Sequence, residues 1–235
     1  MLLHNVVRAT IYHMYGYTFN KSGERTGTKD TVSYSALSLW SKDKQGYRAH
    51  YYEGAPGFTS PYTVFGTEIH RKVEHGEITI PGVNHDDYTH ERKVEATLAG
   101  VPVLGYIDMC HKETNAVIDL KTSKNPWSLS DVQKLDQLPL YIALLREHHE
   151  RVSLWSSVIW IETAWAQDDV TTVSVGGFEA EQDSNRRLAL TERAPVVLKR
   201  RVYNHDIDRV TDWVRATAGE IARDFAAHKL STGTH

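Results

Sequence analysis

The middle of the chain alternates between apolar and polar positions in the way that paired strands do. Two apolar runs, VPVLGYIDMC and AVIDL, flank the polar segment HKETN, and the preceding run YTHERKVEATLAG also alternates. Short alternating runs separated by polar turns are typical of β-strands. The pattern therefore predicts three successive strands, with a turn near Gly100, that form an antiparallel meander.

Helical spacing precedes this meander in two places. Apolar residues recur with helical periodicity in SYSALSLWSKDKQGYRAHYY, where Ser33 or Ser35 supplies the N-cap. A second helix is predicted from about Tyr62 to His75, because Gly76 is suited to the position that follows a helix. The glycines and prolines of EGAPGFTSPY, between the two, indicate a loop.

A third helix is predicted after the meander, in SLSDVQKLDQLPLYIALLREHHE. Ser130 and Gln133 have the spacing of a capping box, which places the start of the helix there. Pro139 lies inside the predicted helix, and we expect it to kink or weaken the helix because proline lacks the backbone donor.

The remaining segments complete a mixed pattern. VSLWSSVIWIE and DVTTVSV are predicted strands, and NHDIDRVTDWVRATAGEIARDFAAH is an amphipathic helix with one apolar stripe. A helix, three strands, a helix and a strand in this order favour an α/β core. We expect a single domain over residues 1–235, with a core at about 32–165 and a C-terminal extension at about 166–235.

Composition narrows the class of protein. The chain has 235 residues, of which 40% are hydrophobic and 24% charged, which suits a globular protein with a sizeable core. It contains no run of roughly 18 apolar residues and no pattern of a secretory signal, so we expect a cytoplasmic protein without a membrane partner. The one cysteine, Cys110, allows no internal disulfide and no cysteine-rich metal site. A net charge of -3 neither indicates nor excludes nucleic-acid binding.

Three charged residues interrupt the most apolar part of the meander. Asp108 and Asp119 lie on neighbouring predicted strands, which run about 4.8 Å apart, so both carboxylates can bind one hard cation. Lys121 follows two residues after Asp119 and therefore lies on the same strand face. A metal ion and a lysine directed at one point suit phosphodiester hydrolysis. The structural alternative is a salt bridge between Asp119 and Lys121, with Asp108 capping a turn.

Further residues extend this set along the chain. Gln137 and Tyr141 lie four apart on one helical face, and His70 lies one turn after Gly66 in the second helix. The ordered motifs G-x-x-x-H, G-x-x-D, D-x-K and Q-x-x-x-Y resemble those of the RecB-type exonuclease branch of the PD-(D/E)XK nuclease superfamily. The resemblance covers about residues 32–145 and includes the opening helix.

This resemblance implies a restriction-endonuclease-like core, with a mixed central sheet flanked by helices, and activity that depends on Mg²⁺ or Mn²⁺. The metal ligands that it implies are His70, Asp108, Asp119 and the main-chain carbonyl of Leu120. Together with Asp108 and Asp119, Lys121 is implied to be catalytic and to act on the water or the scissile phosphate. Gln137 and Tyr141 are implied to bind substrate by orienting Lys121 and the DNA backbone.

The chain also departs from relatives in this branch. Many of them have Glu at the position of Asp119, whereas Ile107, at the position of the proline in the superfamily name, is common in this branch. Many also carry four cysteines that bind an iron–sulfur cluster, whereas Cys110 alone cannot hold one. No G-x-x-x-x-G-K-[ST] motif is present, so we expect DNA to be supplied by a separate helicase or single-strand annealing protein, or held within a homo-oligomer.

Other polar residues have two readings each. Glu91 and Glu95 either add a carboxylate to the site or form a solvated strand face. His148 and His149 fit a metal site, although cations near a helix C-terminus need no further reason. Cys110 either lines the site or is a small buried residue.

Several basic and aromatic residues also have both a DNA-binding and a structural interpretation. The segment LKRRVY, at residues 198–203, either contacts phosphates and stacks a base or is an exposed end of a strand or helix. Lys124 and Lys134 add positive charge with Lys121 where a DNA backbone is expected to pass. Trp127 is either a stacking platform or a core residue.

The sequence thus predicts a metal-dependent DNA exonuclease acting in recombination, repair or phage-style DNA processing. One alternative is a structure- or sequence-specific endonuclease on the same core. A second is a non-catalytic DNA-binding module, whose expected sign is the loss of Asp119 or Lys121, and both residues are present.

Overall fold

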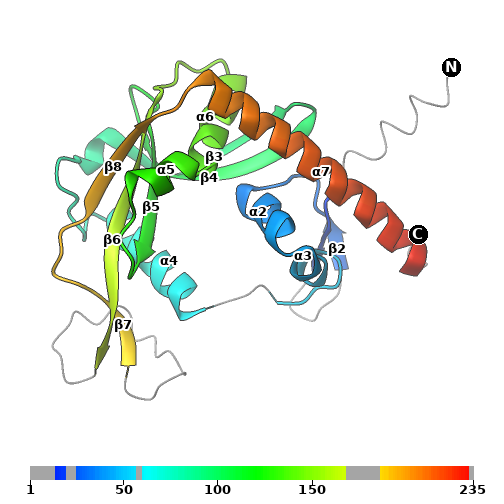
Figure 1. Ribbon diagram of the computed structural model, residues 1–235, viewed down its shortest axis with the longest axis horizontal. Helices are drawn as coiled ribbons and strands as arrows, with labels where there is room; N and C mark the ends of the chain where they lie inside the picture. The colour runs from blue at the N-terminus through cyan, green and yellow to red at the C-terminus, as the bar shows by residue number, and fades with distance from the viewer. Residues whose placement is uncertain (1–13, 20–24, 57–59, 168–185, 233–235) are drawn as a thin grey trace.

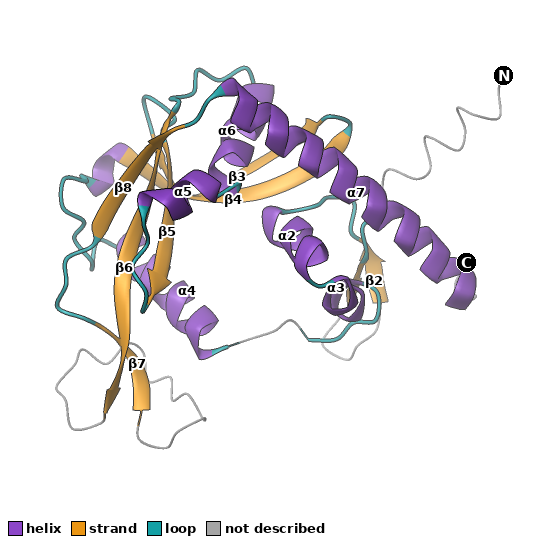
Figure 2. Cartoon of the chain, in the orientation of Figure 1, coloured by secondary structure: helices purple, strands orange, loops and turns teal. Residues whose placement is uncertain are grey.

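The computed structural model describes residues 14–19, 25–56, 60–167 and 186–232, which build a mixed sheet with helices on both faces (Figure 1). The strands of the mixed sheet are β3 (Tyr88–Leu98), β4 (Val101–His111), β5 (Val117–Ser123), β6 (Trp155–Gln167), β7 (Arg186–Leu190) and β8 (Val196–Arg201). A separate two-stranded sheet consists of β1 (Tyr17–Phe19) and β2 (Arg25–Thr28). The helices are α2 (Tyr34–Lys42), α3 (Lys44–Tyr51), α4 (Pro61–Glu74), α5 (Leu129–Lys134), α6 (Gln137–Glu147), α7 (Asn204–Thr232) and the 3-10 helix η1 (His85–Asp87). The predicted α/β fold is confirmed, as Figure 2 shows by secondary structure.

The predicted meander is present as β3, β4 and β5, all antiparallel. β3 and β4 pair over nearly their whole length, from Leu98 opposite Val101 outwards. β4 and β5, in contrast, pair at two positions, one of which is Met109 opposite Ile118. Val32 takes the place that β5 leaves, because it forms a parallel bridge to Val103 on β4. An unpaired stretch of β4 therefore lies between the two contacts.

The second half of the sheet is built around β6. β5 and β6 run parallel, and the connection between them passes through α5 and α6, as parallel strands require. β6 pairs antiparallel with β8 along its first half and with β7 along its second half. Residues 186–201 thus belong to the same sheet as the meander.

The sheet separates two hydrophobic cores. On one face, α4 packs on β5 and β7, and the core there includes Ile69, Leu120 and Ile159. On the other face, α6 and α7 cover β3 and β4, and their core includes Leu140 and Ile221. Because side chains alternate along a strand, Asp119 and Lys121 face away from the α4 core that Leu120 enters.

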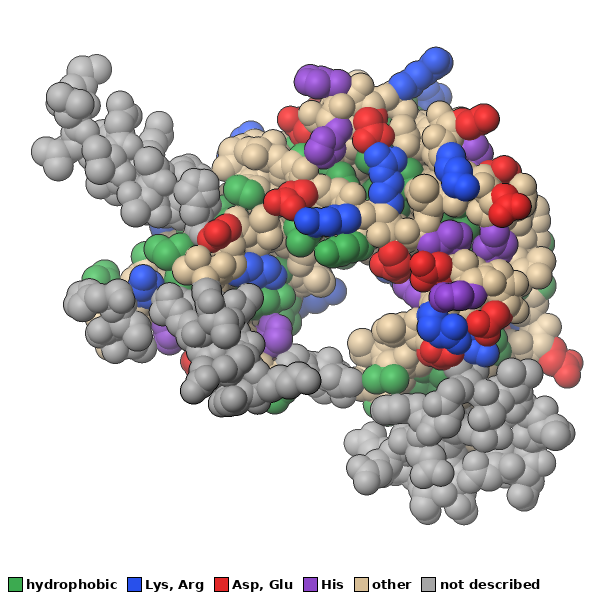
Figure 3. All heavy atoms as spheres, turned by 180° about the vertical axis from the view of Figure 1, so that it is seen from behind, with side chains coloured by type: hydrophobic (Ala, Val, Ile, Leu, Met, Phe, Trp, Pro, Cys, Tyr) green, Lys and Arg blue, Asp and Glu red, His purple; other side chains and the backbone are tan. Residues whose placement is uncertain are grey.

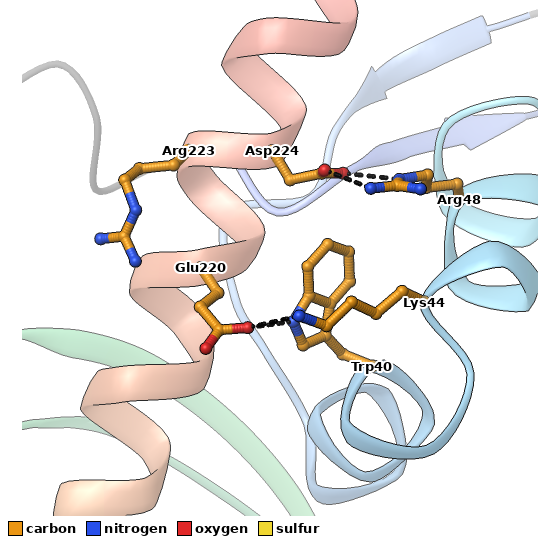
Figure 4. A pocket seen from close by; sticks show the side chains of 6 residues that line it. All are labelled: Trp40, Lys44, Arg48, Glu220, Arg223 and Asp224. Carbon is orange, nitrogen blue, oxygen red and sulfur yellow. Dashed lines mark hydrogen bonds and ion pairs between the residues drawn. The ribbon is translucent and has the colours of Figure 1, made fainter.

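Polar contacts attach α7 to α2 and α3, as Figure 4 shows. Glu220 on α7 accepts a hydrogen bond from Trp40 Nε1 (3.1 Å) and pairs with Lys44 (2.8 Å). One turn further, Asp224 forms a bidentate pair with Arg48. These contacts hold α2, and with it the chain that precedes α2, against the long helix.

The prediction of one continuous helix after the meander is wrong, because the structure has two helices there, α5 and α6. Ser128 is the N-cap of α5, and Asp131 completes the capping box that the sequence pattern assigned to Ser130 and Gln133. Pro139 is the third residue of α6, where its missing N–H costs no intrahelical bond. The proline therefore lies near the start of a helix and does not kink one.

The opening helix predicted as one element is divided into α2 and α3, because Asp43 ends the first helix and caps the second. The second predicted helix is present as α4. Ser33 caps α2 by accepting a hydrogen bond from the Ala36 N–H (3.3 Å), and α4 ends with His75 as its C-cap. The predicted strand DVTTVSV lies outside the described residues. Within the described ranges, no helix combines the length and the hydropathy that a membrane crossing requires.

Candidate active site

Asp108 and Asp119 lie side by side where β4 and β5 separate. Each directly adjoins the last pair of the ladder, Met109 opposite Ile118. Asp108 Oδ2 accepts a hydrogen bond from the backbone N–H of Leu120 at 2.6 Å, so the carboxylate occupies the place of a ladder partner. The two acids are mostly or fully buried, with side-chain exposures of 13% for Asp108 and 1% for Asp119.

A chain of polar contacts leads from Asp119 to α6. Lys121 Nζ lies 2.8 Å from Asp119 Oδ2 and donates to Gln137 Oε1 at 3.1 Å. Gln137 Nε2 in turn donates to the hydroxyl oxygen of Tyr141 at 3.0 Å. The salt bridge between Asp119 and Lys121, which was the structural alternative, is therefore present. Gln137 and Tyr141 lie on one helical face as predicted and belong to the same network. The lysine is held from two sides.

Gly105 explains why Tyr141 fits above the strand. A Cβ built on Gly105 would lie 2.7 Å from Cε1 of Tyr141, a distance that side chains do not tolerate. The glycine of the G-x-x-D motif thus makes room for the ring that orients Gln137. In the G-x-x-D motif, Gly105 is therefore needed for packing against Tyr141, and Asp108 supplies the acid.

His70 reaches the acids from the other side of the sheet. α4 crosses β5 closely, since a Cβ on Gly66 would lie 3.2 Å from Oγ1 of Thr122. One turn later, His70 Nδ1 lies 3.8 Å from Asp108 Oδ1, and the backbone of Leu120 also contacts the imidazole. The predicted approach of His70, Asp108 and Leu120 is therefore observed.

Glu91 completes this group, and the sequence pattern left it undecided. It lies opposite Asp108, where the β3–β4 ladder is interrupted between Arg92 and His90. Its φ of 46° is in the left-handed region, which a non-glycine residue rarely adopts and which often marks a functional site. Glu91 Oε1 lies 3.9 Å from His70 Nδ1. Glu95, four residues on, is half exposed and pairs with Lys93, so it takes no part.

Burial governs the protonation of these groups. It raises the pKa of Asp108 to about 7, with the adjacent Asp119 charge as the next cause. It also raises the pKa of Asp119, against the opposing effect of Lys121. Burial lowers the pKa of His70, which favours the neutral imidazole that binds metals. The site thus concentrates negative charge that is costly without a cation.

The donors fit a divalent cation. Ligand atoms of His70, Glu91 and Asp108 all lie within 4.8 Å of one another. Asp119 adds a buried Oδ1 for which no described residue is a hydrogen-bond partner. Carboxylate oxygens with one imidazole suit Mg²⁺ or Mn²⁺. Among the described residues, the close group thus holds Glu91 in the place where Asp119 was expected, while Asp119 contacts Lys121.

Other candidate residues lie outside this group. His148 contacts the backbone oxygen of Glu95, and His149 adopts a left-handed backbone at the end of α6. Cys110 is fully buried and accepts a hydrogen bond from Arg92 at 3.4 Å, which agrees with a packing role.

The basic segment at residues 198–203 was interpreted either as a phosphate-binding segment or as an exposed end of a strand or helix, and its residues differ in burial. Arg200 is buried and donates to the backbone oxygens of Val132 and Gln133 at the end of α5, while it also pairs with Asp206. Lys199 and the rest of the segment's charge are exposed on β8. Trp127 is partly buried against the α6–α7 core.

Figure 3 shows the molecule from behind, with a hollow in its surface. Acidic and histidine side chains gather along one rim of the hollow, and lysine and arginine side chains lie nearby. An acidic centre with basic neighbours is what a site for a metal ion and a phosphate requires.

Comparisons with known proteins agree with this geometry. The family model described as the PD-(D/E)XK nuclease superfamily matches residues 76–232, which include Glu91, Asp108, Asp119, Lys121 and Gln137. The chain belongs to this superfamily. The protein is therefore a nuclease, from a superfamily whose members use divalent metals.

Solved structures share the fold at low sequence identity. A phage-related exonuclease from Haemophilus somnus 129PT is 14% identical, with a TM-score of 0.50, covering 94% of this chain and 94% of that chain. A candidate exonuclease from Eubacterium rectale is 11% identical, with a TM-score of 0.50, covering 84% of this chain and 82% of that chain. No curated protein sequence matches the chain.

Proposed function

We propose that the protein is a Mg²⁺- or Mn²⁺-dependent DNA exonuclease of the RecB type, acting in recombination, repair or phage-style DNA processing. The observation that carries the proposal is the convergence of two buried acids and a lysine where β4 and β5 separate. Membership of the nuclease superfamily supports phosphodiester hydrolysis, and the two proteins of the same fold described above are named for exonucleases.

The metal ligands in this proposal are side chains that the fold already brings together. His70, Glu91 and Asp108 offer a close set of ligand atoms, and Asp119 offers its unpartnered oxygen. The carbonyl of Leu120 remains a further proposed ligand beside His70. When bound, the ion supplies a more acidic water and a counter-charge for the phosphate.

Lys121 acts on the phosphate or on the attacking water. Hydrolysis forms a bond from the water oxygen to phosphorus and breaks one ester bond, which leaves an alcohol and a phosphate monoester. Negative charge accumulates on the phosphate oxygens in the transition state, and an ammonium fixed in advance stabilises that charge. Asp119 and Gln137 hold Nζ in place, and Tyr141 holds Gln137.

The proposal also names the partners that bring DNA to the site. The sequence has no P-loop for an ATP-driven motor, so a separate helicase or a single-strand annealing protein delivers DNA to it, or several copies form a ring around DNA. Exposed lysines near the site, including Lys124 and Lys134, contact the DNA backbone.

The test is digestion of end-labelled linear single- and double-stranded DNA and of covalently closed circles, with Mg²⁺, Mn²⁺ or EDTA. We expect stepwise loss of nucleotides from linear DNA, no cutting of circles, and no reaction in EDTA. Cutting of circles contradicts the exonuclease proposal in favour of an endonuclease. Binding of DNA without any cleavage contradicts enzymatic function and supports a DNA-binding module.

A further inference from the structure

A cavity of about 370 Å³ adjoins the candidate active site on the α6 side of β4. The residues of its lining that matter here are Lys29, Ser33, Tyr34, Ser35, Gln137 and Tyr141. Gln137 and Tyr141 also belong to the network that holds Lys121. The cavity and the candidate active site therefore share a wall.

Lys29 lines this cavity and forms no ion pair with any of the described residues. No carboxylate of the described residues lies within 4.0 Å of its Nζ, which instead lies 4.2 Å from the centre of the Tyr51 ring. The side chain is only partly exposed, and burial lowers its pKa to about 8. A partly desolvated ammonium next to an open cavity gains stability from any anion that enters.

Two serine hydroxyl groups line the same cavity as Lys29. Ser33 Oγ caps α2 by accepting the Ala36 N–H (3.3 Å) and lies 3.0 Å from Ser35 Oγ. Each hydroxyl can turn its hydrogen toward a ligand oxygen. A lysine with two serine hydroxyls is a donor set suited to a phosphate group.

The position of this set relative to the active site is fixed by backbone contacts. Lys29 donates its N–H to Gly16 O (2.7 Å), and Val32 both donates to Pro102 O (3.0 Å) and accepts from Leu104 N–H (2.8 Å). The segment that carries Lys29 is thereby attached to β4, the strand that carries Asp108. The pKa of Tyr34, which lines the cavity, is raised to about 12 by burial first and then by the charges of Asp136 and Asp119.

We propose that this cavity binds a second phosphate group of the DNA strand, adjacent to the scissile phosphate, with Lys29 as the ionic partner and Ser33 and Ser35 as hydrogen-bond donors. The inference rests on the proposed function and names a substrate contact for it. The phosphate has two possible sources, which share their chemistry: a terminal monoester at a strand end and an internal diester.

The first experiment measures binding without catalysis, in EDTA, by fluorescence anisotropy. The probes are single-stranded oligonucleotides with a 5′-phosphate, with a 3′-phosphate, or with hydroxyls at both ends. Lys29→Met removes the charge and keeps the apolar stem, and we expect it to weaken binding about tenfold or more. Lys44→Met is the matched control, because Lys44 also lies over an aromatic ring (5.1 Å from Trp40) but is paired with Glu220; its affinity should stay at the wild-type value.

The pattern of loss identifies the source. A loss confined to one phosphorylated end assigns the cavity to that terminal monoester, and an equal loss for all three probes assigns it to an internal phosphate. Wild-type affinity of Lys29→Met for all three probes overturns the inference. These binding measurements do not depend on cleavage. The proposed function fails separately if the wild-type protein does not cleave DNA in Mg²⁺ or Mn²⁺.

A second variant covers the case in which Lys29→Met does not fold. Lys29→Arg keeps the charge at every accessible pH, because the guanidinium does not deprotonate in that range. Wild-type affinity should fall as the pH rises above the lysine pKa, and Lys29→Arg should lose this pH dependence. Identical pH profiles for the two proteins overturn the inference.

Discussion

Asp119 and Lys121 form an ion pair in which the acid is almost completely buried and the base is not. The distance from Oδ2 to Nζ is 2.8 Å, and the side-chain exposures are 1% and 27%. Oδ1 of Asp119 has no hydrogen-bond partner among the described residues. A buried carboxylate with one unpartnered oxygen costs stability unless a further cation compensates it.

Asp119→Asn should therefore separate stability from activity. We expect the metal-free variant to be at least as stable as the wild type, because a neutral amide is less costly to bury than a carboxylate. Mn²⁺ should raise the Tm of the wild type and not that of the variant, and cleavage should be lost. The control is Asp212→Asn, since Asp212 is exposed on α7. A variant with a full Mn²⁺ response contradicts the assignment of Asp119 as a ligand.

Asp108 gives the metal-free protein a defined pH dependence. Its pKa in the folded protein is about 7, above its value in the unfolded chain, so the folded state binds more protons between about pH 4 and pH 7. The contribution of Asp108 to stability should consequently fall as the pH rises through this window. Denaturant unfolding in EDTA at several pH values should show a decline that is weaker in Asp108→Asn. The same decline in both proteins would refute the raised pKa.

Glu91 should contribute to metal binding, and Glu95 should not. Glu91→Gln removes one of three ligand atoms that lie within 4.8 Å of one another, so Mn²⁺ affinity measured by calorimetry should fall about tenfold or more. Glu95→Gln is the matched control on the same strand, where the carboxylate is paired with Lys93. Equal affinities in the two variants would show that the unusual backbone of Glu91 serves another purpose.

Gly105 should be intolerant of a methyl group. Gly105→Ala drives a Cβ into the Tyr141 ring, and we expect a cost of about 1–3 kcal/mol in the free energy of unfolding together with slower cleavage. Gly219→Ala, in α7, meets only ordinary contact with Arg223 and should stabilise the protein by up to about 1 kcal/mol. Urea unfolding of both variants measures whether the free energy of unfolding falls in Gly105→Ala and rises in Gly219→Ala. A neutral Gly105→Ala would mean that Tyr141 can move without consequence.

Much of the site was predictable because its parts are local in sequence. Two acids and a lysine on adjacent strands are brought together by the hairpin itself, and the i, i+4 spacing of Gln137 and Tyr141 places them on one helix face. Helix periodicity likewise predicted α4 and α7, since each has one buried stripe.

The remaining features depend on long-range packing. Glu91 enters the site because the chain adopts a left-handed conformation there, and the alternating pattern of β3 gives no sign of it. Lys29 was not predicted to matter, because its position depends on the bridge between Val32 and Val103. The break between α5 and α6 was missed because the residue types at Leu135 and Asp136 do not mark it, although Leu135 adopts an extended backbone that ends α5.

The most direct test of the nuclease site is the single-turnover rate of DNA cleavage in Mn²⁺ for Lys121→Met, compared with the wild type and with Lys93→Met. Lys121 is held at the site by Asp119 and Gln137, whereas Lys93 is an exposed lysine paired with Glu95. We predict a loss of about 100-fold or more for Lys121→Met, with folding and DNA binding retained, and a wild-type rate for Lys93→Met. A folded Lys121→Met protein that cleaves DNA at the wild-type rate would contradict the assignment of this site.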